Sequence, residues 1–266
     1  MREFKVAIIG GSGLYRQSFI ENYKEFTTDT RYGKVSLKTG TYQDKTVYFL
    51  PRHGDSHNVP PHLVNYRANI AALKTLDVDA IIATAAVGTM RREMVPGTRV
   101  IVDQCIDFTR QRPLTFYEGQ EGFVVHTDFS EPYCNEVRSS ILKAGRSLDQ
   151  AMIDGGCYIC TEGPRFETPA EIKMFKDWGA DVVGMTSIPE AILAREAGLC
   201  YATIALPTNY AAGLNNGLLT QEEVLAAMEK DRPQLEELLK ASITEIKPGS
   251  SCSCKEAGKY YPRENQ

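Results

Sequence analysis

The amino-acid sequence predicts a single three-layer α/β/α domain with a central mixed sheet. Short apolar segments typical of buried strands alternate with segments of helical periodicity, the pattern of a sheet covered by helices on both faces. No internal repeat or linker interrupts residues 1–246, so we assign them to one domain. Residues 247–266 form a polar tail that contains a Cys-x-Cys motif.

The composition is that of a globular protein. The chain has 266 residues, of which 42% are hydrophobic and 24% are charged, enough to build one large core. A net charge of -4 without long basic runs gives no support for nucleic acid or an anionic membrane as a partner. No apolar run approaches the ~18 residues of a membrane span, and the amino terminus has no signal-peptide core. We therefore expect a cytoplasmic enzyme.

The amino-terminal half is expected to be rich in strands. Strands are expected over residues 5–9, twice within a hairpin at 33–51, over 80–86 and over 99–103, with a helix over 65–76. The loop Gly10–Gly13 lacks the third glycine of a dinucleotide-binding fingerprint and the lysine of a P-loop. Its small residues still let backbone N–H groups approach an anion. Residues 104–121 are expected to form a loop-rich insert.

Helix-capping patterns organise the carboxyl-terminal half. Thr168-Pro169-Ala170-Glu171 has capping-box spacing with proline at the first helical position, and Ser187-Ile188-Pro189-Glu190 repeats the spacing. The first of these helices should end at Gly179 and the second at Gly198. The other expected elements are a strand over 123–126, a helix over 135–144, strands over 157–160, 180–185 and 199–206, and a helical region from Thr220 to about Ile246 broken near Pro233.

Polar or small residues follow several of these strands. Ligands of open α/β sheets bind at the carboxyl ends of strands, and free N–H groups at a following helix start favour anions. Arginine beside histidine offers a planar fork and a titratable donor, which suits an oxyanion. The alternative is a set of ordinary βα turns with a surface Arg-His pair. The groups at these strand ends are Gly10–Gly13, Arg52-His53, Ala85-Ala86, Met185-Thr186 and Asn209.

The cysteines show no metal-ligand spacing in the sequence, so we expect no metal. The pair Cys157 and Cys160 falls in a strand-like run, where residues three apart face opposite ways. Cys252 and Cys254 lie in the polar tail, where a reactive or disulfide-forming pair is an alternative. Three further cysteines are isolated in apolar surroundings, which predicts small buried side chains: Cys105, Cys134 and Cys200.

Six segments together resemble the purine nucleoside phosphorylase superfamily, specifically the branch that contains methylthioadenosine phosphorylases. They lie in order between residues 4 and about 246, without large gaps, and are specific only as a set. They are IIGGSGLY (8–15), LPRHGDSH (50–57), VNYRANIAALK (64–74), EGPRFETPAE (162–171), GMTSIPEA (184–191) and YATIALPTNYAAG (201–213). The resemblance implies a nucleoside phosphorylase-like fold and a role in purine salvage.

The resemblance also implies reversible phosphorolysis. Inorganic phosphate, a co-substrate, attacks the anomeric carbon of a nucleoside and releases a purine base and a sugar 1-phosphate, with no cofactor. Asn209 and His53 are the residues expected to act in catalysis. Ala85 stands where many members have threonine, so only a main-chain contact is expected there. By resemblance, phosphate is held by Ser12, Arg52, His53, the Ala85 and Ala86 backbone and the Thr186 hydroxyl.

The sugar and base positions follow from the same resemblance. Met185 would lie under the ribose, and Tyr210 and Ala211 would join Asn209 beside the base. His126 matches a position that reaches the sugar pocket of a neighbouring subunit. A homotrimer, or a homohexamer built as a dimer of trimers, is therefore the expected functional unit.

Two positions favour a 6-oxopurine base. Adenosine-type members usually carry aspartate where Asn209 and Ala211 stand, whereas asparagine can donate to the N7 of a departing purine anion. Glu167 matches a position that accepts the N1–H of a 6-oxopurine. Adenine presents a lone pair at N1, so a carboxylate that faces it would be repelled or left unpaired. A buried unpaired polar group costs ~1–3 kcal/mol, which disfavours adenine. The alternative is that Glu167 is a solvated loop residue and Asn209 a turn former.

One position, Gln221, indicates which 5′ substituent of the sugar the site prefers. Methylthio-specific members place an apolar residue where this chain has Gln221, and burying an amide against a thioether would leave its donors unsatisfied. We therefore expect inosine and guanosine as substrates. The rivals are a methylthioinosine or methylthioadenosine phosphorylase, a nucleosidase that uses water, and a non-catalytic purine- or phosphate-binding protein. A slip of the alignment through residues 213–217 would make Gln221 an exposed first-turn residue.

Overall fold

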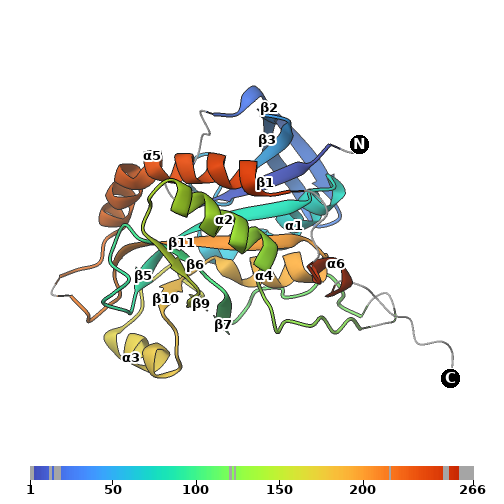
Figure 1. Cartoon of the computed structure of the whole chain (residues 1–266). Coiled ribbons are helices and arrows are strands. Elements are labelled where there is room, and N and C mark those ends of the chain that lie inside the picture. The colour runs from blue at the N-terminus through green and yellow to red at the C-terminus, as the bar shows by residue number, and fades with distance from the viewer. Residues whose placement is uncertain are drawn as a thin grey trace.

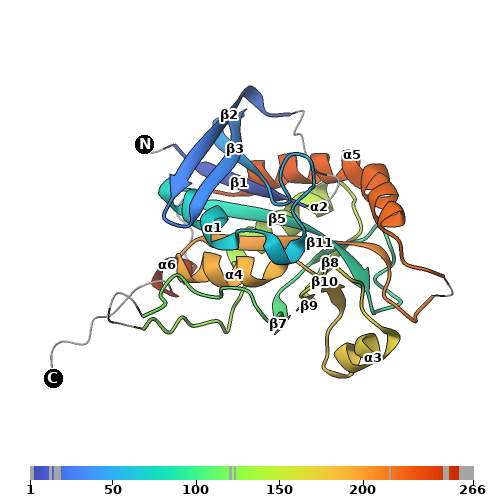
Figure 2. The same ribbon diagram turned by 180° about the vertical axis from the view of Figure 1, so that it is seen from behind.

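The computed structural model describes residues 3–11, 14, 19–119, 122, 124–215, 217–247 and 252–257. In this part of the chain eleven strands form one mixed sheet, and helices lie on both of its faces (Figure 1, and Figure 2 from behind). This arrangement confirms the three-layer α/β/α fold expected from the sequence. None of the helices in the described residues has the length and apolarity needed to span a bilayer.

Helices separate runs of one to four strands along the described chain. The strands are β1 (Lys5–Gly10), β2 (Glu21–Thr30), β3 (Gly33–Tyr42), β4 (Lys45–Pro51), β5 (Ala80–Thr89), β6 (Arg99–Ile101), β7 (Gln104–Phe108), β8 (Met152–Asp154), β9 (Cys157–Thr161), β10 (Val182–Gly184) and β11 (Cys200–Tyr210). The helices are the 3-10 turn η1 (Pro61–Leu63), α1 (Tyr66–Thr75), α2 (Asn135–Ser147), α3 (Pro169–Asp177), α4 (Ser187–Glu196), α5 (Gln221–Glu245) and α6 (Cys254–Ala257).

The middle of the sheet is parallel. Strand β1 pairs with β4 and β5, and β5 pairs with β11, all in the same direction, so their carboxyl ends meet at one edge. Strand β10 runs antiparallel to the end of β5, with Val183 opposite Gly88. The chain that leaves β10 therefore runs back along β5 toward Ala86, and brings Met185 and Thr186 to the same edge.

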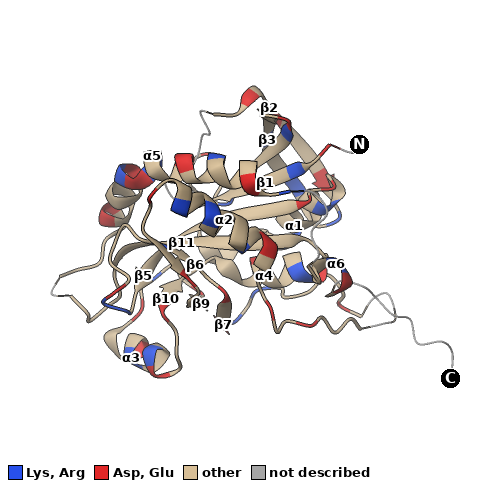
Figure 3. Cartoon of the chain, in the orientation of Figure 1, with Lys and Arg blue, Asp and Glu red and all other residues tan. Residues whose placement is uncertain are grey.

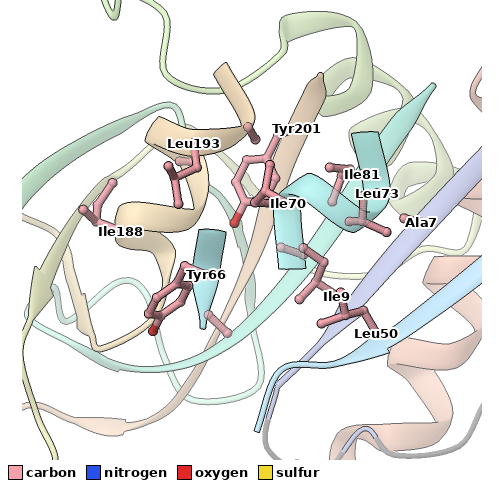
Figure 4. Close-up of a cluster of buried hydrophobic side chains, with 14 of the residues drawn as sticks. Ala7, Ile9, Leu50, Tyr66, Ile70, Leu73, Ile81, Ile188, Leu193 and Tyr201 are labelled. Atoms are coloured by element: carbon pink, nitrogen blue, oxygen red, sulfur yellow. The ribbon is translucent and has the colours of Figure 1, made fainter. Parts of the chain in front are cut away.

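Two clusters of buried side chains separate the three layers. Helices α1 and α4 cover one face of the sheet, and α2 and α5 cover the other (Figures 1 and 2). Successive residues of a strand point to opposite faces, so Ile9 of β1 joins the first cluster and Ile8 the second. Figure 4 shows the first cluster, in which side chains of α1 and α4 meet those of β1, β4 and β5. Figure 3 marks the positions of the charged residues, many of which lie along helices α2, α3 and α5.

Two helix starts follow the capping patterns in the sequence. The Thr168 side chain accepts from the Glu171 N–H, and the Glu171 carboxylate accepts from the Thr168 N–H, which confirms the capping box at the start of α3. The Thr220 side chain accepts from the Glu223 N–H at the start of α5. Helix α5 then continues without a break through Pro233, contrary to the break expected there.

The second predicted capping box is wrong. Thr186, rather than Ser187, is the cap residue of α4, and its side chain makes no capping hydrogen bond. Ile188 has extended φ and ψ angles (−116° and 132°), so the first turn is interrupted. The Glu190 carboxylate is fully buried and binds Arg52, a partner far away in the sequence. A local spacing rule cannot detect such a partner.

Three other expectations need correction. Residues 104–108 form strand β7, inside the segment expected to be a loop-rich insert. Residues 124–126, most of the strand expected over 123–126, are not in a strand. Strand β2 has no counterpart in the sequence prediction, because it lies at the sheet edge and most of its side chains are exposed rather than alternating.

The cysteines expected to be isolated are in part clustered. Cys134 and Cys200 are buried, as predicted, but their sulfurs lie together with those of Cys252 and Cys254. The first residues of helix α6, which contains Cys254, therefore pack against the body of the domain. The polar tail is thus attached to the fold over residues 252–257.

Candidate active site

A cavity of about 540 Å³ opens at the carboxyl ends of β1, β4, β5 and β11. The segments before α3 and after β10, and the first turn of α5, complete its walls. Most residues predicted for the site line this cavity: Arg52, His53, Ala85, Ala86, Glu167, Met185, Thr186, Asn209, Ala211 and Gln221.

Two predicted residues that the structure describes, Tyr210 and His126, do not line this cavity. A third, Ser12, lies outside the described residues. Tyr210 borders a separate hollow, where its hydroxyl donates to the Arg92 carbonyl oxygen over 3.5 Å. His126 is exposed and does not line the cavity of its own chain.

Arg52 is held by a two-point ion pair. Its Nε and Nη2 donate to the two carboxylate oxygens of Glu190 over 2.8 and 2.7 Å, and its Nη1 donates to the Thr84 carbonyl oxygen over 2.8 Å. Burial by itself lowers the pKa of Arg52, but the Glu190 carboxylate outweighs this effect and the pKa is raised. Three of the five N–H donors of the guanidinium are engaged, so at most two can reach a bound anion.

His53 is neutral at physiological pH. Burial and the positive charge of Arg52 lower the pKa of His53 to about 4. Its Nδ1 lies 2.8 Å from the Val59 carbonyl oxygen, so Nδ1 carries the proton and Nε2 is left as an acceptor. A monohydrogen phosphate ion carries one P–O–H group. Such a histidine can accept that proton in a hydrogen bond while Arg52 contributes positive charge.

Arg112 braces the segment that carries Met185 and Thr186. Its Nη1 donates to the carbonyl oxygens of Met185 and Ile188 over 2.7 and 2.6 Å, and its Nη2 donates to the Glu162 carbonyl oxygen over 2.7 Å. The side chain is buried, so these bonds are shielded from water. Arg112 lies in the segment expected to be a loop-rich insert, and no sequence motif marked it.

The absence of a side chain at Gly163 leaves room for the Met185 side chain. Gly163 has a φ of +65°, and a Cβ atom there would lie only 2.6 Å from the Met185 sulfur. Any other residue would be strained and would push against the thioether. The Met185 position predicted for the sugar therefore depends on Gly163, which belongs to the segment EGPRFETPAE.

Glu167 and Asn209 face the same cavity from different elements. Burial raises the pKa of Glu167, and the hydrogen bond that Thr161 donates to it over 2.7 Å opposes this rise. Asn209 follows a bulge in the pairing of β11 with β5. Its amide accepts from the Thr208 hydroxyl over 2.9 Å and donates to the Tyr210 carbonyl oxygen over 2.9 Å, which leaves one amide N–H for a ligand.

Apolar and aromatic side chains form much of the remaining wall of the cavity, together with the polar Asn58 and Thr208. Phe166 lines it beside Glu167, and Leu219 and Val224 flank Gln221 at the start of α5. The His57 ring lies 4.7 Å from the His53 ring, centroid to centroid. No role was predicted from the sequence for four of these lining residues, His57, Phe166, Leu219 and Val224. Two of them, His57 and Phe166, fall within the segments that carry the family resemblance.

The sequence matches the phosphorylase superfamily over residues 5–244. The chain belongs to this superfamily. It is 51% identical to the 6-oxopurine nucleoside phosphorylase of Pyrococcus furiosus over 258 residues, covering 95% of this chain and 97% of the relative. It is 45% identical to a probable S-methyl-5′-thioinosine phosphorylase of Methanothermobacter thermautotrophicus over 254 residues, covering 95% and 88%.

A solved phosphorylase has the same fold. The methylthioadenosine phosphorylase of Schistosoma mansoni in complex with adenine superposes with a TM-score of 0.89 at 32% identity, covering 96% of each chain. The superfamily to which this chain belongs is therefore the one that the six sequence segments indicated. The nearby relatives differ in the substrates that their names state.

Proposed function

We propose that this phosphorylase cleaves 6-oxopurine nucleosides, inosine and guanosine, with inorganic phosphate. The observation that carries the proposal is that Glu167 and Asn209 line one cavity together with Arg52, His53 and Thr186. The first pair suits the N1–H and N7 of a 6-oxopurine, and the other three suit an oxyanion. The name of the relative that is 51% identical supports the same choice.

In the proposed reaction a phosphate oxygen forms a bond to C1′ of the ribose as the bond from C1′ to N9 of the purine breaks. The electron pair of the broken bond leaves with the purine. The phosphate dianion stabilises positive charge on the sugar, and the Asn209 amide donates to N7 of the departing anion. Preorganised donors of this kind are worth about 3–4 kcal/mol each. Phosphate is itself the nucleophile, so the proposed reaction needs no cofactor.

A panel of nucleosides tests the proposal. Inosine, guanosine, adenosine, methylthioadenosine and methylthioinosine are each incubated with the enzyme, with and without phosphate, and the released base is measured. Inosine and guanosine should react at least about tenfold faster than adenosine, and only with phosphate. Faster cleavage of adenosine would overturn the base assignment. Equal rates without phosphate would identify a hydrolase, and no turnover of any nucleoside would identify a binding protein.

A methylthioinosine phosphorylase is the second candidate. It shares the 6-oxopurine base and differs only at the 5′ substituent. Leu219 and Val224 beside Gln221 favour it, because they add apolar surface to the wall expected to face that substituent. The ratio of kcat/KM for inosine to that for methylthioinosine separates the two candidates.

We also propose that the enzyme acts in the cytoplasm as a homotrimer or a dimer of trimers. His126 is exposed in its own chain, as a residue that serves a neighbouring sugar pocket would have to be. Light scattering gives the number of subunits. Mixing inactive His126→Ala chains with inactive Asn209→Ala chains should restore part of the activity if His126 acts across the interface. Absence of any recovery in mixed oligomers would contradict this role.

A further inference from the structure

Four cysteines from three separate segments come together away from the cavity. Cys134 is the cap residue of α2, Cys200 begins β11, and Cys252 and Cys254 belong to the tail. Their four sulfur atoms all lie within 4.8 Å of one another, and three of the four residues are buried. Cys105, by contrast, lies outside this group.

The mutual spacing suits a single central ion. Four thiolate ligands placed about 2.3 Å from a tetrahedral metal lie roughly 3.8 Å from each other. Two separate disulfides would need only two close pairs, each at about 2.05 Å. In the structure the Cys200 and Cys252 sulfurs are 3.3 Å apart. The arrangement therefore has the close approach of all four sulfurs that one shared ligand requires.

The surroundings of the cluster favour negative charge. One divalent ion with four thiolates has a net charge of roughly −2, which needs nearby positive groups. The Arg195 Nη1 donates to the Cys254 sulfur over 3.4 Å, and its Nη2 donates to the Ser253 hydroxyl over 3.2 Å. Arg195 is buried, and Cys134 lies at the amino terminus of α2, where the helix dipole also favours a thiolate.

The backbone around the cluster is shaped for the tail. Gly198, two residues after the end of α4, has a φ of +70°, and a Cβ atom there would lie 3.5 Å from Cα of Lys255. The Cys134 N–H donates to the Tyr201 carbonyl oxygen over 2.7 Å, which ties the start of α2 to β11 beside Cys200. The body of the domain therefore positions Cys134 and Cys200, and the tail contributes Cys252 and Cys254.

We propose that Cys134, Cys200, Cys252 and Cys254 hold one Zn²⁺ ion, which fastens the carboxyl-terminal tail to the domain. Thiolate sulfur in a tetrahedral set is the environment that Zn²⁺ prefers in structural sites. All four positions are filled by protein, so the ion has a structural role and takes no part in the reaction. The ion joins α2, β11 and α6, three elements that are otherwise far apart in the sequence.

Metal analysis of the full-length protein tests this proposal. The protein is purified without chelator or reductant, and bound metal is measured by inductively coupled plasma mass spectrometry. About one Zn²⁺ per chain is expected in the unaltered protein and in the control variant Cys105→Ser. The double variant Cys252→Ser/Cys254→Ser, altered only in the tail, should lose it. Retention of the metal by the double variant, or absence of metal from the unaltered protein, would overturn the proposal.

Cobalt and thiol chemistry give independent readings. After metal removal, Co²⁺ should produce an intense thiolate-to-metal charge-transfer band in the unaltered protein and none in the double variant. Chelation should lower the thermal midpoint of the unaltered protein only. The rival is disulfide pairing: if cells are lysed in an alkylating reagent and the denatured chain carries fewer than seven alkylated cysteines, disulfides are present and the zinc site is refuted.

Discussion

Arg52 and Glu190 form a buried two-point ion pair at the edge of the candidate active-site cavity. The four atoms involved make contacts of 2.8 and 2.7 Å, and both side chains are almost completely shielded from water. The Tyr201 hydroxyl also donates to Glu190 over 2.8 Å. Arg52 follows β4 and Glu190 lies in α4, so the pair connects a strand end to the helix that follows Thr186.

Replacing Glu190 should destabilise the fold strongly. In Glu190→Gln the Arg52 charge stays buried without its counter-ion, and removing one partner of such a pair costs about 3–5 kcal/mol. The free energy of unfolding, measured with urea, is the readout. The control is Glu237→Gln, which breaks an exposed ion pair with Lys240 and should change the unfolding free energy by less than about 1 kcal/mol. If both substitutions changed the free energy of unfolding equally, the buried Arg52 charge would not need Glu190 as its counter-ion.

Asn209→Asp should shift base preference toward 6-aminopurines. A protonated aspartate can donate to N7 and its other oxygen can accept from a 6-amino group, whereas asparagine suits a 6-oxo group. We expect the ratio of kcat/KM for inosine to that for adenosine to fall by at least about tenfold. Asn215→Asp, in an exposed position outside the main cavity, should leave the ratio unchanged. An unaltered ratio in Asn209→Asp would count against the assigned role.

Gln221→Leu should favour a methylthio group at the 5′ position. The substitution would join Leu219 and Val224 in an apolar wall and remove an amide that can pair with a 5′-hydroxyl. The ratio of kcat/KM for methylthioinosine to that for inosine should rise by about tenfold. Glu222→Leu, one residue further along α5 and outside the cavity, serves as the control. If both variants behave alike, Gln221 does not contact the 5′ substituent.

The buried His53 should make the fold sensitive to acid. Its pKa is about 4 in the folded protein, below the ordinary ~6.5, because burial and the Arg52 charge disfavour protonation. The unfolded chain therefore binds the proton first as the pH falls. Stability present above pH ~6.5 should be lost progressively down to pH ~4, by about 3 kcal/mol.

Urea unfolding of phosphate-free protein at pH 7.5 and pH 4.5 checks this sign. His53→Gln should lose clearly less stability between these two pH values than the unaltered protein. His62→Gln, at an exposed position, should behave like the unaltered protein. His57 contributes in the same direction, since burial also lowers its pKa. An identical acid response in His53→Gln would refute the prediction.

Arg112→Met should impair phosphate use although Arg112 lies outside the cavity lining. The carbonyl oxygens of Met185 and Ile188 would lose their donor, which costs more than about 2 kcal/mol of stability. Thr186 would be less well placed, so KM for phosphate should rise several-fold, and Arg112→Lys should restore part of the loss. Arg110→Met, at an exposed position two residues away, is the control. An unchanged KM for phosphate would show a purely structural role for Arg112.

The periodic parts of the fold could be predicted from the sequence because their signals are local. Apolar runs located β1, β5 and β11, and the capping box at Thr168 located α3, since each depends on residues within a few positions of one another. The strand ends carrying Arg52, Thr186 and Asn209 were expected to meet, and they line one cavity.

Contacts between distant segments were decided only by the tertiary structure. Glu190 was assigned to a helix cap because its spacing fits one, yet its charge pairs with Arg52, 138 residues earlier. Arg112 gave no signal, because most of its partners are backbone carbonyl groups, which every residue has, and its carboxylate partner Glu162 lies 50 residues away in the sequence. The reversed direction of β10, which brings Met185 beside Ala86, likewise depends on pairing with β5.

The sequence by itself located most of the helices and the central strands, and it determined the family and the candidate residues for binding an anion and a purine. The tertiary structure decided which of those residues share a cavity and which charges neutralise each other. It also brought together four cysteines whose spacing in the chain resembles no metal motif. The physical reason is range: propensity, periodicity and capping act over a few residues, whereas burial, ion pairing and ligand clustering depend on contacts that only the folded chain creates.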